Sequence, residues 1–123
     1  MYVGSGSRHD SPVTTGASYL TQRMALRGTS SMTKTEQHQN IENLGAIWDA
    51  KSDREHTSFN LQCHKEDTSR AVSFLGDAIC NMQLNPAEVE QLKVEVSNEH
   101  EASFNNYKEV TMENSHFNVY REH

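Results

Sequence analysis

Apolar residues recur at helical spacing near the start of the chain. A short strand is predicted over residues 1–7, followed by a polar turn around residues 11–12 and a predicted helix over 17–27. Leu20 and Met24 lie near one side of this helix, and Gly28 follows at the position where a helix commonly ends. The pattern therefore predicts a strand followed by an amphipathic helix.

A second helix is predicted over residues 33–44. Thr33 and Glu36 have the spacing of a capping box, in which each side chain satisfies a backbone amide of the other residue. Ile41 and Leu44 give this helix an apolar edge. The remaining positions are polar, so we expect most of this helix to face solvent.

After Gly45 the period changes from helical to alternating, which predicts a β-hairpin with its turn at residues 52–54. The second strand of the hairpin has the clearest alternation in the chain, with one face predicted to be buried and the other wet. The predicted buried residues are Thr57, Phe59, Leu61 and Cys63, and the predicted wet residues are Ser58, Asn60, Gln62 and His64.

Helical spacing returns in the second half of the chain. A helix over 69–82 is predicted to bury one apolar stripe, and a longer helix is predicted to begin at Pro86, where a first-turn proline is tolerated. The stripe of the first consists of Val72, Leu75, Ile79 and Met82. The inner side of the second is predicted to hold Val89, Leu92, Val96, Glu99, Phe104, Tyr107 and Val110.

Composition limits the functions open to this α+β chain of 123 residues. Only 34% of the residues are hydrophobic and the mean hydropathy is −0.80, so we expect a small core that depends on partner chains. The net charge of −6, without any run of Lys or Arg, argues against nucleic-acid binding. No apolar stretch is long enough to span a membrane. The two cysteines are expected to be reduced.

One segment of the first predicted helix carries a recognisable motif. Tyr19, Gln22 and Arg23 are followed by Met24-Ala25-Leu26-Arg27-Gly28-Thr29. The segment resembles the zinc-binding helix of the pitrilysin-type, or inverzincin, metallopeptidases, which reads His-x-x-Glu-His in active members before a similar apolar, basic and Gly-Thr sequence. Tyr19, Gln22 and Arg23 stand at the three chemical positions. Residues 24–29 thus match the family sequence, whereas the three positions that carry the zinc chemistry do not.

Two other segments extend the resemblance along the chain. Relatives carry a Gly-Ser-Arg sequence followed by an aromatic and an acid, matched by residues 6–10, and a hairpin sequence matched by residues 45–50 and 52–57. The family's third zinc ligand is a glutamate on a later helix, and Glu99 lies 76 residues after Arg23, at the corresponding position. Read without the resemblance, Glu99 is a solvated acid on a helix rich in glutamate.

The chemistry of these positions argues against zinc and against hydrolysis. Zinc takes imidazole, thiolate or carboxylate ligands, and a phenol, an amide and a guanidinium supply none of them at neutral pH. The Gln22 amide cannot act as a general base. We therefore expect no metal, no cofactor and no catalytic residue. Two interpretations stay open for the substituted positions: drift in an inactive homologue, or an Arg23–Glu99 ion pair that fills the former zinc pocket.

The resemblance implies a partial peptidase-like sandwich, with helices on a mostly antiparallel sheet completed by partner chains. Residues 1–123 would be a fragment or truncated form of the family's N-terminal domain. The implied function is a non-catalytic core-type subunit of respiratory complex III, with other core and membrane subunits as partners, on the matrix side of the mitochondrial inner membrane. The alternative is a non-catalytic subunit of the mitochondrial processing peptidase that binds presequences.

Overall fold

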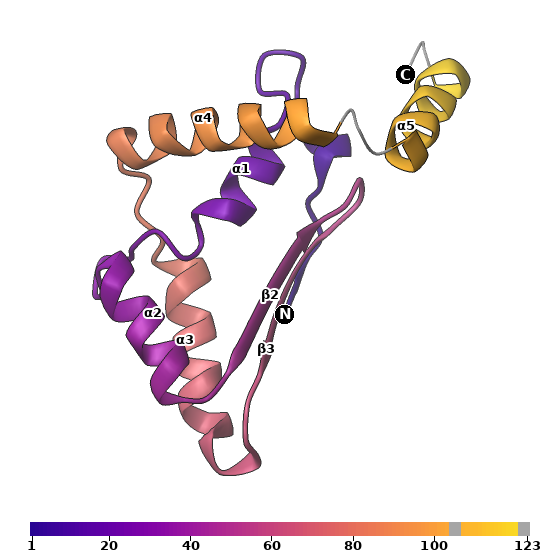
Figure 1. The fold of residues 1–123 in the computed structure, drawn as a ribbon. Helices are drawn as coiled ribbons and strands as arrows, with labels where there is room; N and C mark the ends of the chain where they lie inside the picture. The colour runs from indigo at the N-terminus through magenta and orange to yellow at the C-terminus, as the bar shows by residue number, and fades with distance from the viewer. Residues whose placement is uncertain (104–106, 121–123) are drawn as a thin grey trace. The chain divides into compact units, whose positions relative to one another are not determined.

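The computed structural model describes residues 1–103 and 107–120 (Figure 1). The chain divides into two compact units, Met1–Val89 and Glu90–His123, which are taken separately below. The elements in chain order are β1 (Tyr2–Val3), η1 (Ser7–His9), α1 (Ala17–Met24), α2 (Lys34–Asn43), β2 (Ile47–Ser52), β3 (Thr57–Gln62), η2 (Lys65–Asp67), α3 (Thr68–Cys80), α4 (Pro86–Ser103) and α5 (Tyr107–Val119).

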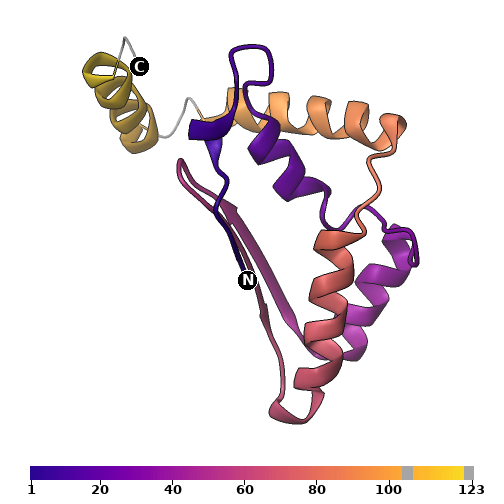
Figure 2. The ribbon, with the colours of Figure 1, turned by 180° about the vertical axis from the view of Figure 1, so that it is seen from behind.

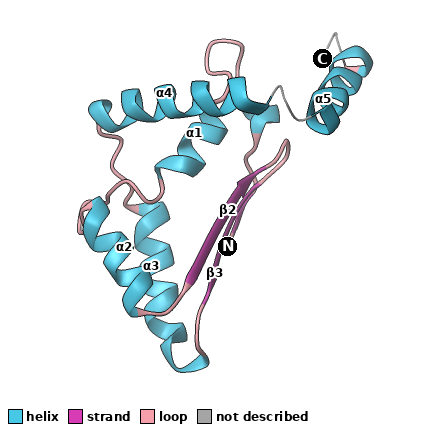
Figure 3. Ribbon diagram, viewed as in Figure 1, coloured by secondary structure: helices cyan, strands magenta, loops and turns pink. Residues whose placement is uncertain are grey.

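The first unit is an antiparallel sheet of three strands with helices packed against it, as the α+β prediction requires (Figures 2 and 3). The strand order is β1-β3-β2, so β3 is the central strand. Tyr2 of β1 lies opposite Ser58 of β3, and Ala50 of β2 lies opposite Phe59 of β3. Figures 1 and 2 show the helices of this unit on the same side of the sheet.

Three aromatic side chains join the sheet to α3. The Trp48 ring on β2 lies 6.0 Å from the Phe59 ring on β3 and 6.3 Å from the Phe74 ring on α3, the second pair nearly perpendicular. Phe59 and Phe74 are buried. Aromatic pairs of this kind contribute about 0.5–1.5 kcal/mol beyond their buried area. This aromatic cluster forms one part of the core of the first unit, which also includes Met24, Ala25 and Leu44.

The buried face of α3 differs from the prediction. Val72 is 63% exposed, whereas Ala71, Phe74 and Ala78 are buried. Residues 71, 74 and 78 follow the helical period and form a stripe beside the predicted one. The two alanines let the helix approach its neighbours closely, and Phe74 fills the space against Trp48. The prediction favoured large apolar residues and so placed the core face one position away.

The wet face of β3 also differs from the prediction at one residue. Ser58 is buried, although it alternates with Thr57 and Phe59. Because β3 is the central strand, Ser58 has Tyr2 on one side and Lys51 on the other, and these neighbours cover it. Its hydroxyl donates to the Lys51 carbonyl at 3.4 Å. Burial of a serine is tolerated here because this hydrogen bond satisfies the hydroxyl.

The predicted capping box at the start of α2 is confirmed. The Thr33 hydroxyl accepts a hydrogen bond from the Glu36 amide at 3.3 Å, and the Glu36 carboxylate accepts one from the Thr33 amide at 2.7 Å. The Thr33 amide, and after it the Thr33 hydroxyl at 2.8 Å, donate to the Glu36 carboxylate and lower the pKa of Glu36. The helix ends at Asn43, and Gly45 follows with φ at 54°, a left-handed conformation that favours glycine.

Asp77 near the end of α3 anchors the loop that follows α1. Its carboxylate accepts hydrogen bonds from the Thr29 hydroxyl at 2.8 Å, the Ser31 hydroxyl at 2.7 Å and the Asn81 amide at 2.7 Å. These donors, that of Asn81 first, lower the pKa of Asp77. Thr29 also forms an isolated antiparallel bridge with Met82. The carboxylate thus holds two segments together that are far apart in the sequence.

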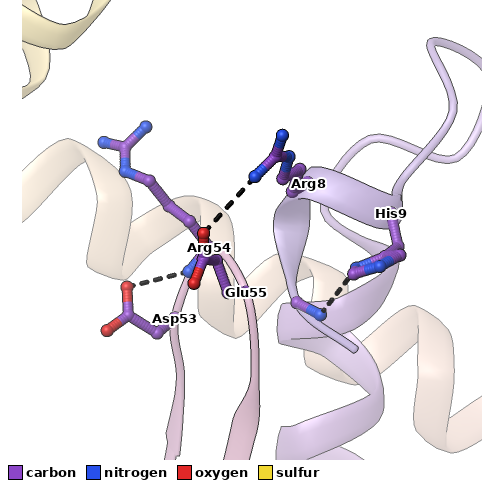
Figure 4. Close-up of polar contacts among 6 residues, drawn as sticks. Arg8, His9, Asp53, Arg54 and Glu55 are labelled. Carbon is purple, nitrogen blue, oxygen red and sulfur yellow. Dashed lines mark hydrogen bonds and ion pairs between the residues drawn. The ribbon is translucent and has the colours of Figure 1, made fainter. Parts of the chain in front are cut away.

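The β2–β3 turn fits closely against the segment that follows β1 (Figure 4). The amides of Ser7 and Arg8 donate to the carbonyls of Asp53 at 3.1 Å and Arg54 at 2.9 Å. A side-chain β carbon on Gly6 would collide with the Asp53 carbonyl oxygen and the Arg54 backbone. Arg8 and Glu55 add an exposed ion pair at 3.4 Å. Glycine is therefore required at position 6 by the close approach of the turn.

The second unit contains most of α4 and all of α5. One long helix was predicted from Pro86, and the described residues form two helices instead. Glu99 and Tyr107 were predicted on its inner side, but both are exposed. Phe104, predicted on its inner side, lies outside the described residues. The exposed apolar side chains of α5 include Tyr107, Met112 and Phe117. In the described parts of the chain, the helices are too short or too polar to cross a bilayer.

We predict that Gly6→Ala lowers the free energy of unfolding by about 2 kcal/mol or more, because the added methyl group collides with the backbone of the turn. Gly4→Ala is the matched control: nothing lies within 4 Å of a β carbon at Gly4. The control should stay within about 0.5 kcal/mol of the parent chain. Urea denaturation monitored by circular dichroism measures both changes. Equal losses in the two variants would contradict the assigned contact.

We predict that Asp77→Asn lowers the free energy of unfolding by about 1 kcal/mol at pH 7, because the charged acceptor is lost. The pKa of Asp77 in the folded chain lies below its ordinary value of 3.8. Its stabilisation is therefore present above that value and is lost as the pH falls through the lower folded pKa. The difference between parent and variant should vanish in acid.

The control for Asp77→Asn is Asp49→Asn, which alters an exposed carboxylate on β2. Denaturation curves at a series of pH values give the free energy of unfolding of the parent and of both variants. The Asp77 variant should show a pH-dependent difference from the parent, and the Asp49 variant should follow the parent. A difference for Asp77→Asn that persists unchanged in acid would show that its carboxylate charge is not the cause.

Candidate functional site

The N-terminus of α1 is fixed by a carboxylate from outside the helix. Asp10 accepts hydrogen bonds from the Gly16 amide at 2.9 Å, the Ser18 amide at 3.2 Å and the Ser18 hydroxyl at 2.7 Å. The Ser18 hydroxyl is the main cause of the lowered pKa of Asp10, and the backbone amides add to it. A negative charge here also complements the helix dipole. Asp10 therefore holds the start of the helix that carries the candidate site.

The C-terminal end of α1 is satisfied by a fully buried amide from α2. Gln37 is 0% exposed; its oxygen accepts from the Gly28 amide at 2.9 Å, and its nitrogen donates to the Ala25 carbonyl at 3.2 Å. Arg27, with 11% of its side chain exposed, pairs with Glu88 at 3.2 Å. These contacts give the end of α1 a fixed position between α2 and the start of α4.

Tyr19 and Arg23 lie on the same face of α1, one turn apart. The Arg23 guanidinium carbon is 6.0 Å from the centre of the Tyr19 ring, at the outer limit of a cation–π contact. Tyr19 is 39% exposed and Arg23 is half-buried. At the two positions that the motif resemblance assigns to the histidines of active members, this chain therefore holds an aromatic ring beside a permanent positive charge.

Gln22 is directed to the sheet. It is 8% exposed, and its Nε2 donates a hydrogen bond to the Ala50 carbonyl of β2 at 3.1 Å. An ionised carboxylate at this position has no proton to donate, so a glutamate would lose this bond. The Gln22 amide thus links α1 to β2.

A cavity of about 380 Å³ lies beside α1 in the first unit. Phe59, Ile79 and Met82 give it apolar walls, and Ser18 and Gln22 line the α1 side. Among the described residues that line it, Asp10 is the only one with a titratable side chain. Its carboxylate accepts hydrogen bonds from three donors, and one titratable group among these lining residues does not make an acid–base pair.

The residues at the candidate site do not fit a zinc ion. Tyr19 and Arg23 present a phenol and a guanidinium, and Gln22 presents an amide that is bonded to Ala50. Over residues 1–103 and 107–120, no group of three or more His, Cys, Asp or Glu side chains is arranged to hold a metal ion. Glu99 lies in α4 and belongs to the second unit, so its pairing with Arg23 stays a prediction.

Two residues that position α1 were missed from the sequence. Asp10 precedes the helix by several residues, and the intervening loop hides its capping role. Gln37 did give a signal, because it lies four residues before Ile41 on the apolar edge of α2. A polar residue on a buried helical face needs a hydrogen-bond partner, and its partners are backbone groups at the end of α1.

Relatives with known names share this sequence over much of its length. The human mitochondrial-processing peptidase subunit beta is 29% identical over 121 residues, which cover 98% of this chain and 25% of that protein. The bovine cytochrome b-c1 complex subunit 1, mitochondrial, is 30% identical over 91 residues, which cover 74% of this chain and 19% of that protein. The chain thus spans about a quarter of the length of these relatives.

The fold is shared with a solved structure of low sequence identity. The crystal structure of a protease from Helicobacter pylori superimposes with a TM-score of 0.79 at 13% identity, over 85% of this chain and 25% of that chain. The family model described as insulinase, peptidase family M16, matches residues 1–123. The chain belongs to this insulinase family of peptidases, family M16.

Proposed function

We propose that this chain is a non-catalytic, core-type structural subunit of respiratory complex III, on the matrix side of the mitochondrial inner membrane. The observation that carries the proposal is the chemistry of Tyr19, Gln22 and Arg23, which supplies neither zinc ligands nor a general base. Gln22 supports it further, because its amide is used to hold β2. The helix that would carry catalysis in this family serves here as a packing element.

Similarity to a complex III subunit supports the choice of complex III as the host assembly. The bovine cytochrome b-c1 complex subunit 1 is 30% identical over 91 residues of this chain. The resemblance at Tyr19 also favours this assembly, because it implies a tyrosine at the same position in core-type subunits. Electron transfer in the proposed complex belongs to partner subunits, and this chain contributes to assembly.

The surface of the first unit suits a subunit that is covered by partners. Ile47, Val72 and Leu84 are large apolar residues that are more than half exposed. In the described part of the sheet, β1 pairs with Thr57 and Ser58 and Met1 bonds to Phe59, so the far end of β3 beyond Phe59 has no strand on that side. Unpaired strand edges and exposed apolar side chains are normally covered in stable proteins.

The second candidate is a non-catalytic subunit of the mitochondrial processing peptidase that binds presequences. Its support is the longer similarity, 121 residues at 29% identity to the human beta subunit of that enzyme. The net charge of −6 would favour binding of basic presequences. This candidate shares the inactive site with the first and differs from it in the partner proteins.

We predict that the purified chain retains no stoichiometric zinc after dialysis, because its helix presents no ligand pair. The variant Tyr19→His with Arg23→His places two imidazoles one helical turn apart and should gain measurable zinc affinity. Metal content by mass spectrometry and zinc titration by calorimetry compare the two proteins. One zinc per parent chain would overturn the proposal that the site is inactive.

We predict that the chain migrates with haem-containing subunits when mitochondrial membranes are gently solubilised and separated on a native gel. Haem staining and mass spectrometry of the same band measure this outcome. Migration in a soluble heterodimer that cleaves presequence peptides would favour the processing-peptidase candidate instead. Migration of the chain alone would contradict both assemblies.

A further inference from the structure

The hydrogen bonds of β3 determine which backbone groups of β2 point outward. The Phe59 amide donates to the Met1 carbonyl at 2.8 Å, and the Met1 amino group donates to the Phe59 carbonyl at 2.7 Å. Phe59 therefore directs both of its backbone groups to the β1 side. Its partner in the register on β2 is Ala50. In an antiparallel pair of this kind, the Ala50 amide and carbonyl must point away from β3, to the outer edge of β2.

The outward carbonyl of Ala50 is the one that Gln22 binds. The Gln22 Nε2 lies 3.1 Å from the Ala50 oxygen, and the Gln22 side chain is nearly fully buried. The middle of the β2 edge is thus occupied by a side chain from α1. Covering an edge strand in this way is a recognised means of preventing another strand from pairing with it.

The sequence of β2 is complementary to itself in an antiparallel pair. With Ala50 opposite Ala50 of a second copy, Asp49 lies opposite Lys51 of the second copy, and the reverse pair repeats it by two-fold symmetry. In the same register, the outward backbone groups of Trp48 lie opposite those of Ser52 of the second copy. Asp49 and Lys51 are both exposed, and in this register they form a close, non-hydrogen-bonded pair.

We propose that Gln22 prevents β2 from pairing with β2 of a second copy of this chain. The buried Gln22 amide occupies the Ala50 carbonyl at the two-fold centre of that pair. When this contact is removed, the edge presents free backbone groups flanked by two complementary charge pairs. The position that carries a general base in active family members therefore controls self-association in this chain.

The test compares self-association of the parent chain with that of Gln22→Leu and Gln22→Asn, by sedimentation over a range of concentrations. Leucine has no donor, and asparagine is too short to reach the Ala50 carbonyl. Both variants should form a dimer, with self-association at least about tenfold tighter than that of the parent. Gln39→Leu, which changes an exposed glutamine of α2, should behave as the parent.

A second substitution tests whether the dimer forms through the edge of β2. Lys51→Asp added to Gln22→Asn sets like charges opposite each other across the proposed pair and should abolish the dimer. Adding Asp49→Lys as well restores opposite charges and should restore the dimer. Circular dichroism verifies the fold, and Gln22→Asn decides the result if Gln22→Leu does not fold. A folded Gln22→Asn that stays monomeric, or a dimer that is insensitive to Lys51→Asp, overturns the proposal.

Discussion

The two ends of α1 carry backbone amides and carbonyls that need hydrogen-bond partners in a packed interior. Side chains from other parts of the first unit supply these partners. Asp10 accepts from the amides at the N-terminal end, and the buried Gln37 bonds both the carbonyl of Ala25 and the amide of Gly28. These partners come from the loop before α1 and from α2. The position of α1 is therefore set from outside the helix, and Gln22 then reaches the sheet from a helix that is already fixed.

The elements of this fold were predictable because their signals are local. The Thr33–Glu36 capping box and Gly45 lie next to the helix boundaries that they were predicted to set. The first helix was predicted to run to residue 27 and to end at Gly28, but it ends at Met24, so Gly28 does not set its boundary. The faces of the elements were less predictable. Burial of Ser58 depends on a third strand, and the inner face of α3 depends on the ring of Trp48, so neither follows from one element alone.

In the candidate site, too, local features were predictable and contacts between elements were not. Alignment of the motif located Tyr19, Gln22 and Arg23 on the first helix, and the donor chemistry of these side chains could be judged from residue type. The contact of Gln22 with Ala50 could not, because it depends on the strand register that directs this carbonyl outward. The amide at position 22 is visible in the sequence. Its contact with the strand appears only when the sheet is assembled.

The pairing of β1 with β3 has a consequence for the order in which the first unit forms. β2 and β3 are joined by a short turn, whereas Met1 bonds to Phe59 across a separation of 58 residues and Ser5 bonds to Thr57 across 52. Closing such long loops costs more chain entropy than closing a hairpin. We therefore expect β1, the first strand in the sequence, to join the sheet last, after the helices between β1 and β3 have formed.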